Sequence, residues 1–221
     1  MKIPVTAVIG AIAVVAAALA FGAVRWQASL RSIDAGFWYD DGSIALSGDD
    51  AAKIGGPLTA QEMATIRQMS RAEVERALAD LRINVTENQN AFWRVSVVGT
   101  APGNASIPHY PFASAGESHV FGPLGSWGSV GFLILAHNAI EYAPLSASRQ
   151  EIVAGIGRGI GRAAVHEFAH MALGSAGNIT NIDNRTDNTS YEYGNADRPS
   201  QYYGELRWTT AWPILEQKFG R

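Results

Sequence analysis

The strongest hydrophobic pattern in the chain covers residues 148–174. Apolar residues recur there at helical intervals, at Ile152, Ile156, Ile160 and Ala163. Ser148 and Glu151 have the spacing of a capping box, which satisfies backbone N–H groups in the first turn of a helix, and Gly174 suits a helix end. No proline interrupts the segment. The pattern therefore predicts one long helix over residues 148–174.

A second helical pattern covers residues 60–82. The apolar residues of its buried stripe are Val74, Ala77, Leu78 and Leu81. Capping boxes occur twice in this region, at Thr59 with Glu62 and at Ser70 with Glu73. We therefore expect either one kinked helix or two short helices, which would back the domain.

Segments with the composition of β-strands lie between these two patterns. Residues 83–85 and 92–98 are rich in branched and aromatic side chains, and the second segment alternates apolar with polar positions. Residues 129–135 form a continuous apolar run, which predicts a buried or edge strand. The stretch 99–128 is rich in proline and glycine and is expected to be a long loop with a short strand at 118–121. Helices and strands in this order indicate an α+β fold with a small sheet.

Four glycines, at positions 155, 157, 159 and 161, lie within the long predicted helix. A phosphate-binding G-x-G-x-x-G would need glycine at 160 or 162, where Ile160 and Arg162 stand. We instead expect the glycines to line two faces of the helix and to let neighbouring backbones approach closely, at about 1 kcal/mol each relative to alanine. Downstream, residues 200–219 predict a last helix, which Pro213 is expected to kink.

The chain begins with a hydrophobic segment. Residues 3–24 are 22 consecutive uncharged residues, enough to cross a bilayer as a helix. Their number favours an uncleaved anchor, whereas the A-x-A site at 18–20 favours a cleavable signal peptide. We therefore expect an anchor or signal segment at 1–25, a juxtamembrane linker at 26–56 and a folded domain at 57–221. That domain would be membrane-anchored outside the cytoplasm, or secreted if the segment is cleaved.

Composition limits the chemistry that the domain can use. The chain of 221 residues has no cysteine, which excludes disulfides, thiolate metal sites and thiol nucleophiles. Its net charge of -3 gives no electrostatic reason to expect a nucleic-acid partner. Hydrophobic residues at 47% and charged residues at 17% indicate a globular protein.

His166 and His170 enclose the motif H-E-x-x-H near the end of the long predicted helix. Residues four apart lie on the same helix face, so both imidazoles can bind one metal ion with Glu167 beside them. Zinc binds imidazole nitrogen well, and a catalytic zinc site needs three protein ligands and an open position for water. Glu167 would then be the general base that takes a proton from this water. The predicted cofactor is therefore Zn²⁺, with its third ligand downstream of Gly174.

The motif resembles that of the zincin superfamily of metallopeptidases. A metzincin would need glycine at 173 and histidine at 176, where Leu173 and Ala176 stand. The closest resemblance is to the aspzincins, the deuterolysin-like peptidases, in which H-E-x-x-H is followed by G-T-x-D-x-x-Y-G. When that pattern is aligned on Thr186 and Tyr191, the family's ligand aspartate falls on Asn188.

The resemblance implies a third zinc ligand and an oxyanion donor. Asp187 lies next to the aligned position and is the expected third ligand. The alternatives are Asp183, Glu192, Glu205 and the loop histidines His109 and His119. Tyr191 is the expected donor of a hydrogen bond to the oxyanion of the tetrahedral intermediate. The rival donors are Tyr193, Tyr202 and Tyr203.

Together these features predict an α+β, zincin-like domain with a small sheet, a backing helix and an active-site helix, tethered by one N-terminal transmembrane helix. The expected function is a zinc-dependent metallopeptidase that hydrolyses a peptide or protein substrate. A metal site of this kind specifies hydrolysis better than it specifies the substrate. Two alternatives are therefore open: a metal-dependent amide hydrolase of a non-protein substrate, and a non-catalytic zincin-like binding or assembly protein on the membrane.

Overall fold

Five strands form a mixed β-sheet in the order β2-β1-β3-β7-β6. They are β1 (Ile33–Tyr39), β2 (Ile83–Thr86), β3 (Trp93–Val98), β6 (Gly116–Val120) and β7 (Ser126–Gly131). β2, β1, β3 and β7 run parallel, and β6 pairs antiparallel with β7 at one edge. The structure, a computed structural model, describes residues 32–40, 42, 44–102, 113–120, 125–174, 193, 196–208 and 211–221.

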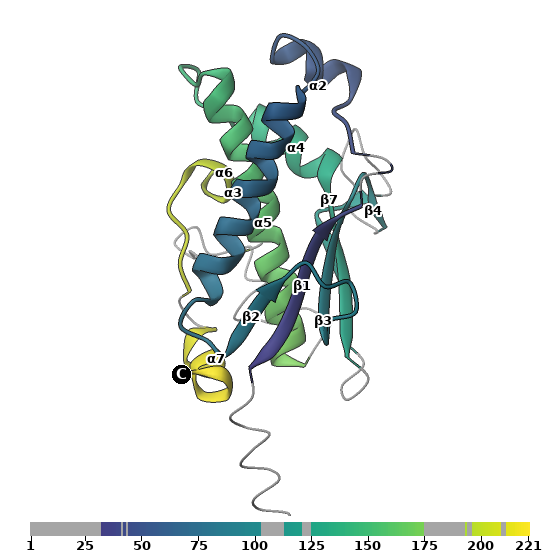
Figure 1. Ribbon diagram of the computed structural model, residues 1–221. Coiled ribbons are helices and arrows are strands. Elements are labelled where there is room, and N and C mark those ends of the chain that lie inside the picture. Colours follow the sequence, from purple (N-terminus) through teal and green to yellow (C-terminus); the bar gives the residue numbers. More distant parts are fainter. Residues whose placement is uncertain are drawn as a thin grey trace, which may run out of the picture. The chain divides into compact units, whose positions relative to one another are not determined.

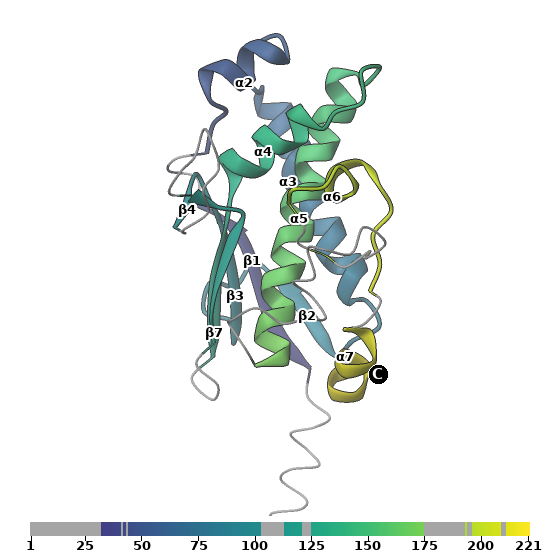
Figure 2. The same ribbon diagram turned by 180° about the vertical axis from the view of Figure 1, so that it is seen from behind.

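Two long helices cover one face of the sheet (Figure 1, Figure 2). α3 (Ala60–Leu78) and α5 (Arg149–Leu173) pack against each other, and α5 also contacts β3, β6 and β7. The shorter helices are α2 (Gly48–Lys53), α4 (Phe132–Glu141), α6 (Ser200–Tyr203) and α7 (Trp212–Phe219). The short strands β4 (Ala101–Pro102) and β5 (Ala113–Ser114) pair with each other. The prediction of an α+β fold is confirmed.

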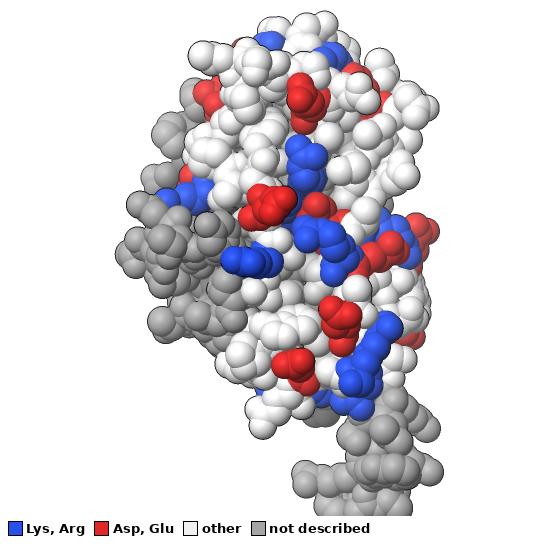
Figure 3. Space-filling model, turned by 90° about the vertical axis from the view of Figure 1, so that its left-hand side faces the viewer, with Lys and Arg blue, Asp and Glu red and all other residues white. Residues whose placement is uncertain are grey.

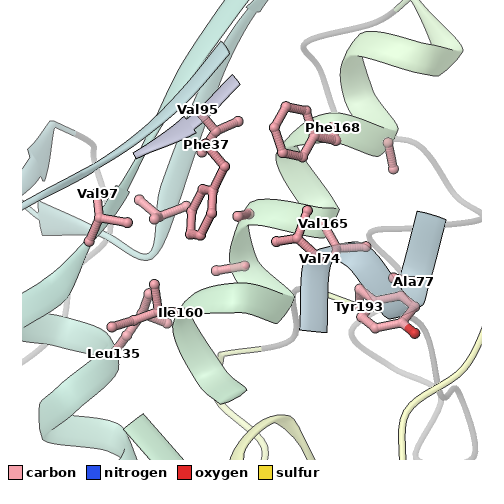
Figure 4. Packing of buried hydrophobic residues seen from close by; sticks show 14 of the residues in the cluster. Phe37, Val74, Ala77, Val95, Val97, Leu135, Ile160, Val165, Phe168 and Tyr193 are labelled. Carbon is pink, nitrogen blue, oxygen red and sulfur yellow. The ribbon is translucent and has the colours of Figure 1, made fainter. Parts of the chain in front are cut away.

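The core lies between the sheet and α5. Trp93, Val95 and Val97 alternate along β3 as the sequence predicts, and each is at most 3% exposed. Figure 4 shows Phe37 and Val95 on the sheet side of this core and Phe168 on the α5 side. Burial of such side chains contributes roughly 1.5–3 kcal/mol each. This packing fixes the rotation of α5, and therefore decides which helix face lies next to β6.

Helix α5 begins and ends where the sequence predicts. Ser148 is the N-cap: its hydroxyl accepts the backbone N–H of Glu151, and the Glu151 carboxylate accepts the backbone N–H of Ser148. Gly174 ends the helix in the left-handed conformation, with φ of 77°, which glycine adopts without strain. The histidine motif therefore lies in the last two turns of a helix whose ends are both well defined.

α3 is one helix of 19 residues rather than two short ones. The capping box of Thr59 and Glu62 forms as predicted. The second predicted box does not, because Ser70 and Glu73 lie inside the helix and make tertiary contacts. The Ser70 hydroxyl bonds to the hydroxyl of Tyr39 on β1 at 2.8 Å, and both Ser70 and Glu73 are buried. An S-x-x-E spacing is therefore used here to join α3 to its neighbours.

The prediction of a linker at 26–56 is wrong for the residues that form β1 and α2. β1 lies between β2 and β3 in the sheet, and Phe37 is 3% exposed in the core. A strand of a parallel sheet is stabilised by partners far along the chain. The seven residues of β1 stand among glycine and aspartate residues and show no alternation that would mark them as a strand.

Two other element boundaries differ from the prediction. The strand expected at 129–135 ends at Gly131, and α4 begins at Phe132. A continuous apolar run does not distinguish a buried strand from a buried helix, and most of α4 is buried. The last helix expected at 200–219 is instead two helices, α6 and α7. Pro213 lies in the first turn of α7, where its missing N–H leaves no hydrogen bond unmade.

Charged side chains of both signs are interspersed on the side of the molecule where α3, α6 and α7 lie (Figure 3). On α3, for example, Arg71 pairs with Glu75 at 2.7 Å. Solvent screens exposed pairs of this kind, so each stabilises the fold by at most about 1 kcal/mol. The anchoring of α3 must therefore come from its buried contacts.

None of the helices within the described ranges is both long enough and apolar enough to span a bilayer. The predicted anchor at 3–24 lies outside those ranges. The transmembrane helix and the export of the domain therefore stay predictions.

Candidate metal centre

The C-terminal half of α5 brings two imidazoles together. His166 and His170 lie one turn apart, and their Nε2 atoms are 3.0 Å from each other. The ring planes are inclined at 84°, with 4.6 Å between the ring centroids. His170 is 5% exposed, and His166 is partly buried. The two rings therefore share one helix face, as the four-residue spacing predicts.

A backbone carbonyl determines which nitrogen of His166 carries a proton. Nδ1 of His166 lies 2.9 Å from the carbonyl oxygen of Tyr193. A carbonyl oxygen only accepts hydrogen bonds, so Nδ1 is protonated, and in the neutral imidazole Nε2 keeps its lone pair. Metal-binding imidazoles are commonly oriented by such a bond from the remote nitrogen. His166 therefore presents a lone pair toward Nε2 of His170.

The facing Nε2 atoms fit a divalent cation. At 3.0 Å, either a proton in a hydrogen bond between the rings or a cation must lie between the two Nε2 atoms. Zinc binds imidazole nitrogen at about 2.0–2.1 Å, so this separation is within the span of two ligands on one ion. Among the described residues, no group of three His, Cys, Asp or Glu side chains is placed to hold a metal. The histidine pair would supply two of the three ligands that a catalytic zinc needs.

Glu167 follows His166 in α5, and its carboxylate is turned toward β6. The residue is 4% exposed, and its Oε2 accepts a hydrogen bond from the hydroxyl of Ser118 on β6. Gly116 on the same strand is so near that a Cβ there would overlap the carboxylate. Sequence reasoning missed both contacts, because Ser118 is 49 positions from Glu167. The only local signal was the expected short strand at 118–121.

A buried ion pair joins α5 to α3 one turn before His166. Arg162 is 3% exposed, and its Nε donates to Oε2 of Glu73 at 3.1 Å. Its Nη1 donates to the carbonyl oxygens of Ser200 and Gln201 at 2.8 and 3.0 Å. Burial lowers the pKa of Arg162, although the carboxylate of Glu73 opposes this shift. These bonds hold α5 against two neighbouring segments, and so determine where His166 lies.

Of the rival tyrosines that the structure describes, Tyr193 and Tyr202 are buried and Tyr203 is partly buried. The hydroxyl of Tyr202, a fully buried residue, donates to the carbonyl of Ala196 at 2.9 Å. The hydroxyl of Tyr203 donates to a backbone carbonyl of α4, and burial raises the pKa of Tyr203 to about 12. Tyr193 is 2% exposed, and its contribution to the site is the carbonyl that orients His166. Tyr191, the predicted oxyanion donor, lies outside the described residues.

Most of the predicted third ligands also lie outside the described residues: Asp187, Asp183, Glu192 and His109. Glu205 lines a cavity of about 580 Å³ whose walls include three arginines. His119 stacks on Trp127 with 3.9 Å between ring centroids, and its Nε2 lies 3.6 Å from the carboxylate of Glu117. Neither Glu205 nor His119 completes a three-residue metal group within the described chain. Asp187 therefore stays a prediction.

Comparison with known proteins finds no match for this chain. No protein-family model matches the chain, and no curated protein or solved structure matches it either. The resemblance to zincins therefore rests on the motif in α5, and a function has to be argued from the geometry around that motif.

Proposed function

We propose that the protein is a zinc-dependent metallopeptidase whose metal is held by His166 and His170. The observation that carries this proposal is the pair of facing Nε2 atoms, 3.0 Å apart. The bond from Nδ1 of His166 to the carbonyl of Tyr193 supports it, because it leaves the Nε2 lone pair available. The simplest competing explanation of the pair is a hydrogen bond between the two rings, which predicts a protein indifferent to zinc.

Each residue of the proposed site has a separate role. His166 and His170 bind the ion through Nε2, and Asp187 is the proposed third ligand. Glu167, the E of the H-E-x-x-H motif, is the proposed general base, which would take a proton from the attacking water and give it to the leaving amine. Tyr191 is the proposed hydrogen-bond donor to the oxyanion. When bound, zinc supplies Lewis acidity and lowers the pKa of water to about 7.

The surroundings of Glu167 favour an extended peptide as substrate. β6 is an outer strand of the five-stranded sheet, and it contacts the Glu167 carboxylate through Ser118. Outer strands bind extended peptides through main-chain hydrogen bonds. A peptide that aligned with β6 would lie along the strand that contacts the proposed general base. This arrangement supports peptides over small amides as the substrate class.

Zinc content and peptide cleavage, measured on the same samples, test the proposal. The purified protein should bind about one zinc per chain and cleave casein. Glu167→Gln should keep the zinc and lower cleavage by about 10²–10⁴-fold, because it removes the base but no ligand. His166→Ala and His170→Ala should lose both zinc and cleavage.

His137→Ala is the matched control for the histidine variants. His137 lies on α4 and its Nδ1 contacts Asp50 at 2.9 Å, so its loss should leave zinc content and cleavage unchanged. A wild-type protein that holds no zinc and does not respond to added zinc would contradict the proposal. Zinc without cleavage of any peptide would favour the binding protein, and cleavage of non-peptide amides alone would favour the other hydrolase.

We also propose that residues 3–24 tether the domain to a membrane, with the domain outside the cytoplasm. The support is the uncharged run of 22 residues. The full chain should sediment with membranes, and a chain that lacks residues 1–25 should not. Equal distribution of both chains between the fractions would contradict the anchor.

A further inference from the structure

Strand β6 directs alternate side chains to opposite faces of the sheet. Glu117 and His119 lie on the outer face, where His119 stacks on the exposed ring of Trp127. Gly116 and Ser118 lie on the inner face, which α5 covers. At the two inner positions that contact Glu167, β6 therefore has one glycine and one small hydroxyl residue, and Val120 is its third inner position.

These two inner positions enclose a single carboxylate. The hydroxyl of Ser118 donates to Oε2 of Glu167, which is the direction that an ionised carboxylate requires, because it only accepts hydrogen bonds. At Gly116 a Cβ would overlap Oε1 of the same carboxylate. Gly128, the partner of Ser118 in β7, keeps the neighbouring space small, since a Cβ there would lie 3.3 Å from Cε of Met171. α5 consequently lies close enough to β6 for a serine hydroxyl to reach the carboxylate.

A buried carboxylate needs donors, because burial of a charge without them is costly. Glu167 is 4% exposed, and a hydrogen bond to a charged acceptor is roughly twice as strong as a neutral one. A general base also needs a fixed position, since a misplacement of about 1 Å can cost about 10²-fold in rate. We propose that Ser118 is a positioning residue that fixes the Glu167 carboxylate on the side of α5 that faces β6. This role rests on the proposed peptidase function.

A set of variants at Ser118 separates the hydroxyl from the shape of the side chain. Ser118→Ala should lower kcat about 10–100-fold and leave KM and zinc content unchanged, because the bond that it removes is to the proposed base. Ser118→Thr keeps the hydroxyl and should restore most of kcat. Ser118→Val has the shape of threonine without its hydroxyl and should behave like Ser118→Ala. Ser129→Ala, on the outer face of β7, is the control and should keep the wild-type kcat.

A double-mutant cycle on the metal-free protein tests the same contact without any catalysis. Ser118→Ala should lower Tm by an amount on the order of 5 °C, because it removes a bond to a buried charge. In a Glu167→Met background, which has no carboxylate to satisfy, the same substitution should lower Tm much less. The difference between the two shifts is the coupling of Ser118 to Glu167.

The two experiments distinguish failure of this role from failure of the proposed function. Equal Tm shifts in both backgrounds, or a wild-type kcat in Ser118→Ala, would overturn the positioning role and leave the peptidase proposal intact. A wild-type protein that binds no zinc and hydrolyses nothing would overturn the proposed function, and the positioning role with it.

Discussion

Both halves of α5 pack very closely against their neighbours. The glycines that permit this belong to the helix itself in one half and to a strand of the sheet in the other. In the N-terminal half, α5 supplies them: Gly157 and Gly161 rest on the backbone of α3, and Gly155 and Gly159 rest on the tyrosines of α6. In the C-terminal half, the strand supplies the glycine, at Gly116 of β6. The helix there keeps its long polar side chains.

This difference determines what each half of α5 can do. Where the helix itself has no side chain, it gains close packing but has no functional group to present. The four glycines cost about 1 kcal/mol each in helix propensity, which the contacts with α3 and α6 must offset. Where the strand has no side chain, the helix can keep His166, Glu167 and His170 in a buried contact. Substitutions in the first half should therefore damage the fold, and substitutions around the second should damage the proposed chemistry.

The largest effect on stability is expected at the buried ion pair of Arg162, near the middle of α5. Glu73→Ala leaves Arg162, which is 3% exposed, without its carboxylate and should lower the free energy of unfolding by about 3–5 kcal/mol. Urea unfolding measures this. The double variant Glu73→Ala with Arg162→Met should be more stable than Glu73→Ala alone, since no charge is then left buried. A single variant within about 1 kcal/mol of the wild type would show that this pair does not anchor α5.

The next largest effect should fall more on catalysis than on folding. Gly116→Ala places a Cβ where the Glu167 carboxylate lies, and the end of that side chain can move aside without backbone strain. We expect kcat to fall about 10²-fold with zinc content close to wild type, and a loss of stability similar to that of Ser118→Ala, because the carboxylate would leave the same hydrogen bond. Gly48→Ala is the matched control, because a Cβ at Gly48 meets no atom within 4 Å. Equal kcat values for the two variants would contradict the proposed position of the base.

Gly161→Ala should show the opposite pattern. A Cβ at Gly161 would overlap the carbonyl oxygen of Ser70 and lie 2.7 Å from Cβ of Glu73, and neither atom is at the end of a flexible side chain. We expect a loss of about 1–3 kcal/mol in the free energy of unfolding, with kcat per folded molecule unchanged. Gly155→Ala meets mainly the ring of Tyr203, at 2.9 Å. This ring is only partly buried, so the loss should be smaller there.

A contrast between local and long-range contacts explains which parts of the fold could be predicted from the sequence. The caps at Ser148 and Gly174 depend on residues within one helical turn, and the sequence predicts both correctly. The position of β1 between β2 and β3 depends on pairing with residues such as Ile83 and Trp93, and no local pattern reports it. The run at 129–135 is ambiguous for another reason, since a buried strand and a buried helix both require continuous apolar residues.

The candidate site likewise has local features that the sequence predicts and long-range contacts that it does not. The spacing of His166 and His170 predicts that they share a helix face, and their Nε2 atoms do face each other. The Ser118 hydroxyl and the Tyr193 carbonyl come from segments 49 and 27 positions from their partners. A serine hydroxyl and a backbone carbonyl occur throughout any chain and have no sequence motif, so these two contacts could not be predicted. Asp187, which the family resemblance proposes as a ligand, lies outside the described residues and stays a prediction.

The smallest effect is expected where α5 begins, at a partly exposed ion pair that contrasts with the buried one. Nε of Arg149 lies 2.6 Å from Oε1 of Glu62, and hydrogen bonds from Arg149 and the backbone of Thr59 lower the pKa of Glu62 from 4.5 to about 2. The ionised carboxylate therefore stabilises the fold above about pH 4.5, and this contribution is lost as the pH falls toward about 2.

Because solvent screens the pair, Glu62→Gln should cost less than about 1 kcal/mol near pH 6. The difference between wild type and variant in urea unfolding should shrink from about pH 4.5 to about pH 3. A constant difference would mean that Glu62 acts there as a neutral helix cap, and that only the buried pair uses its charge to hold α5.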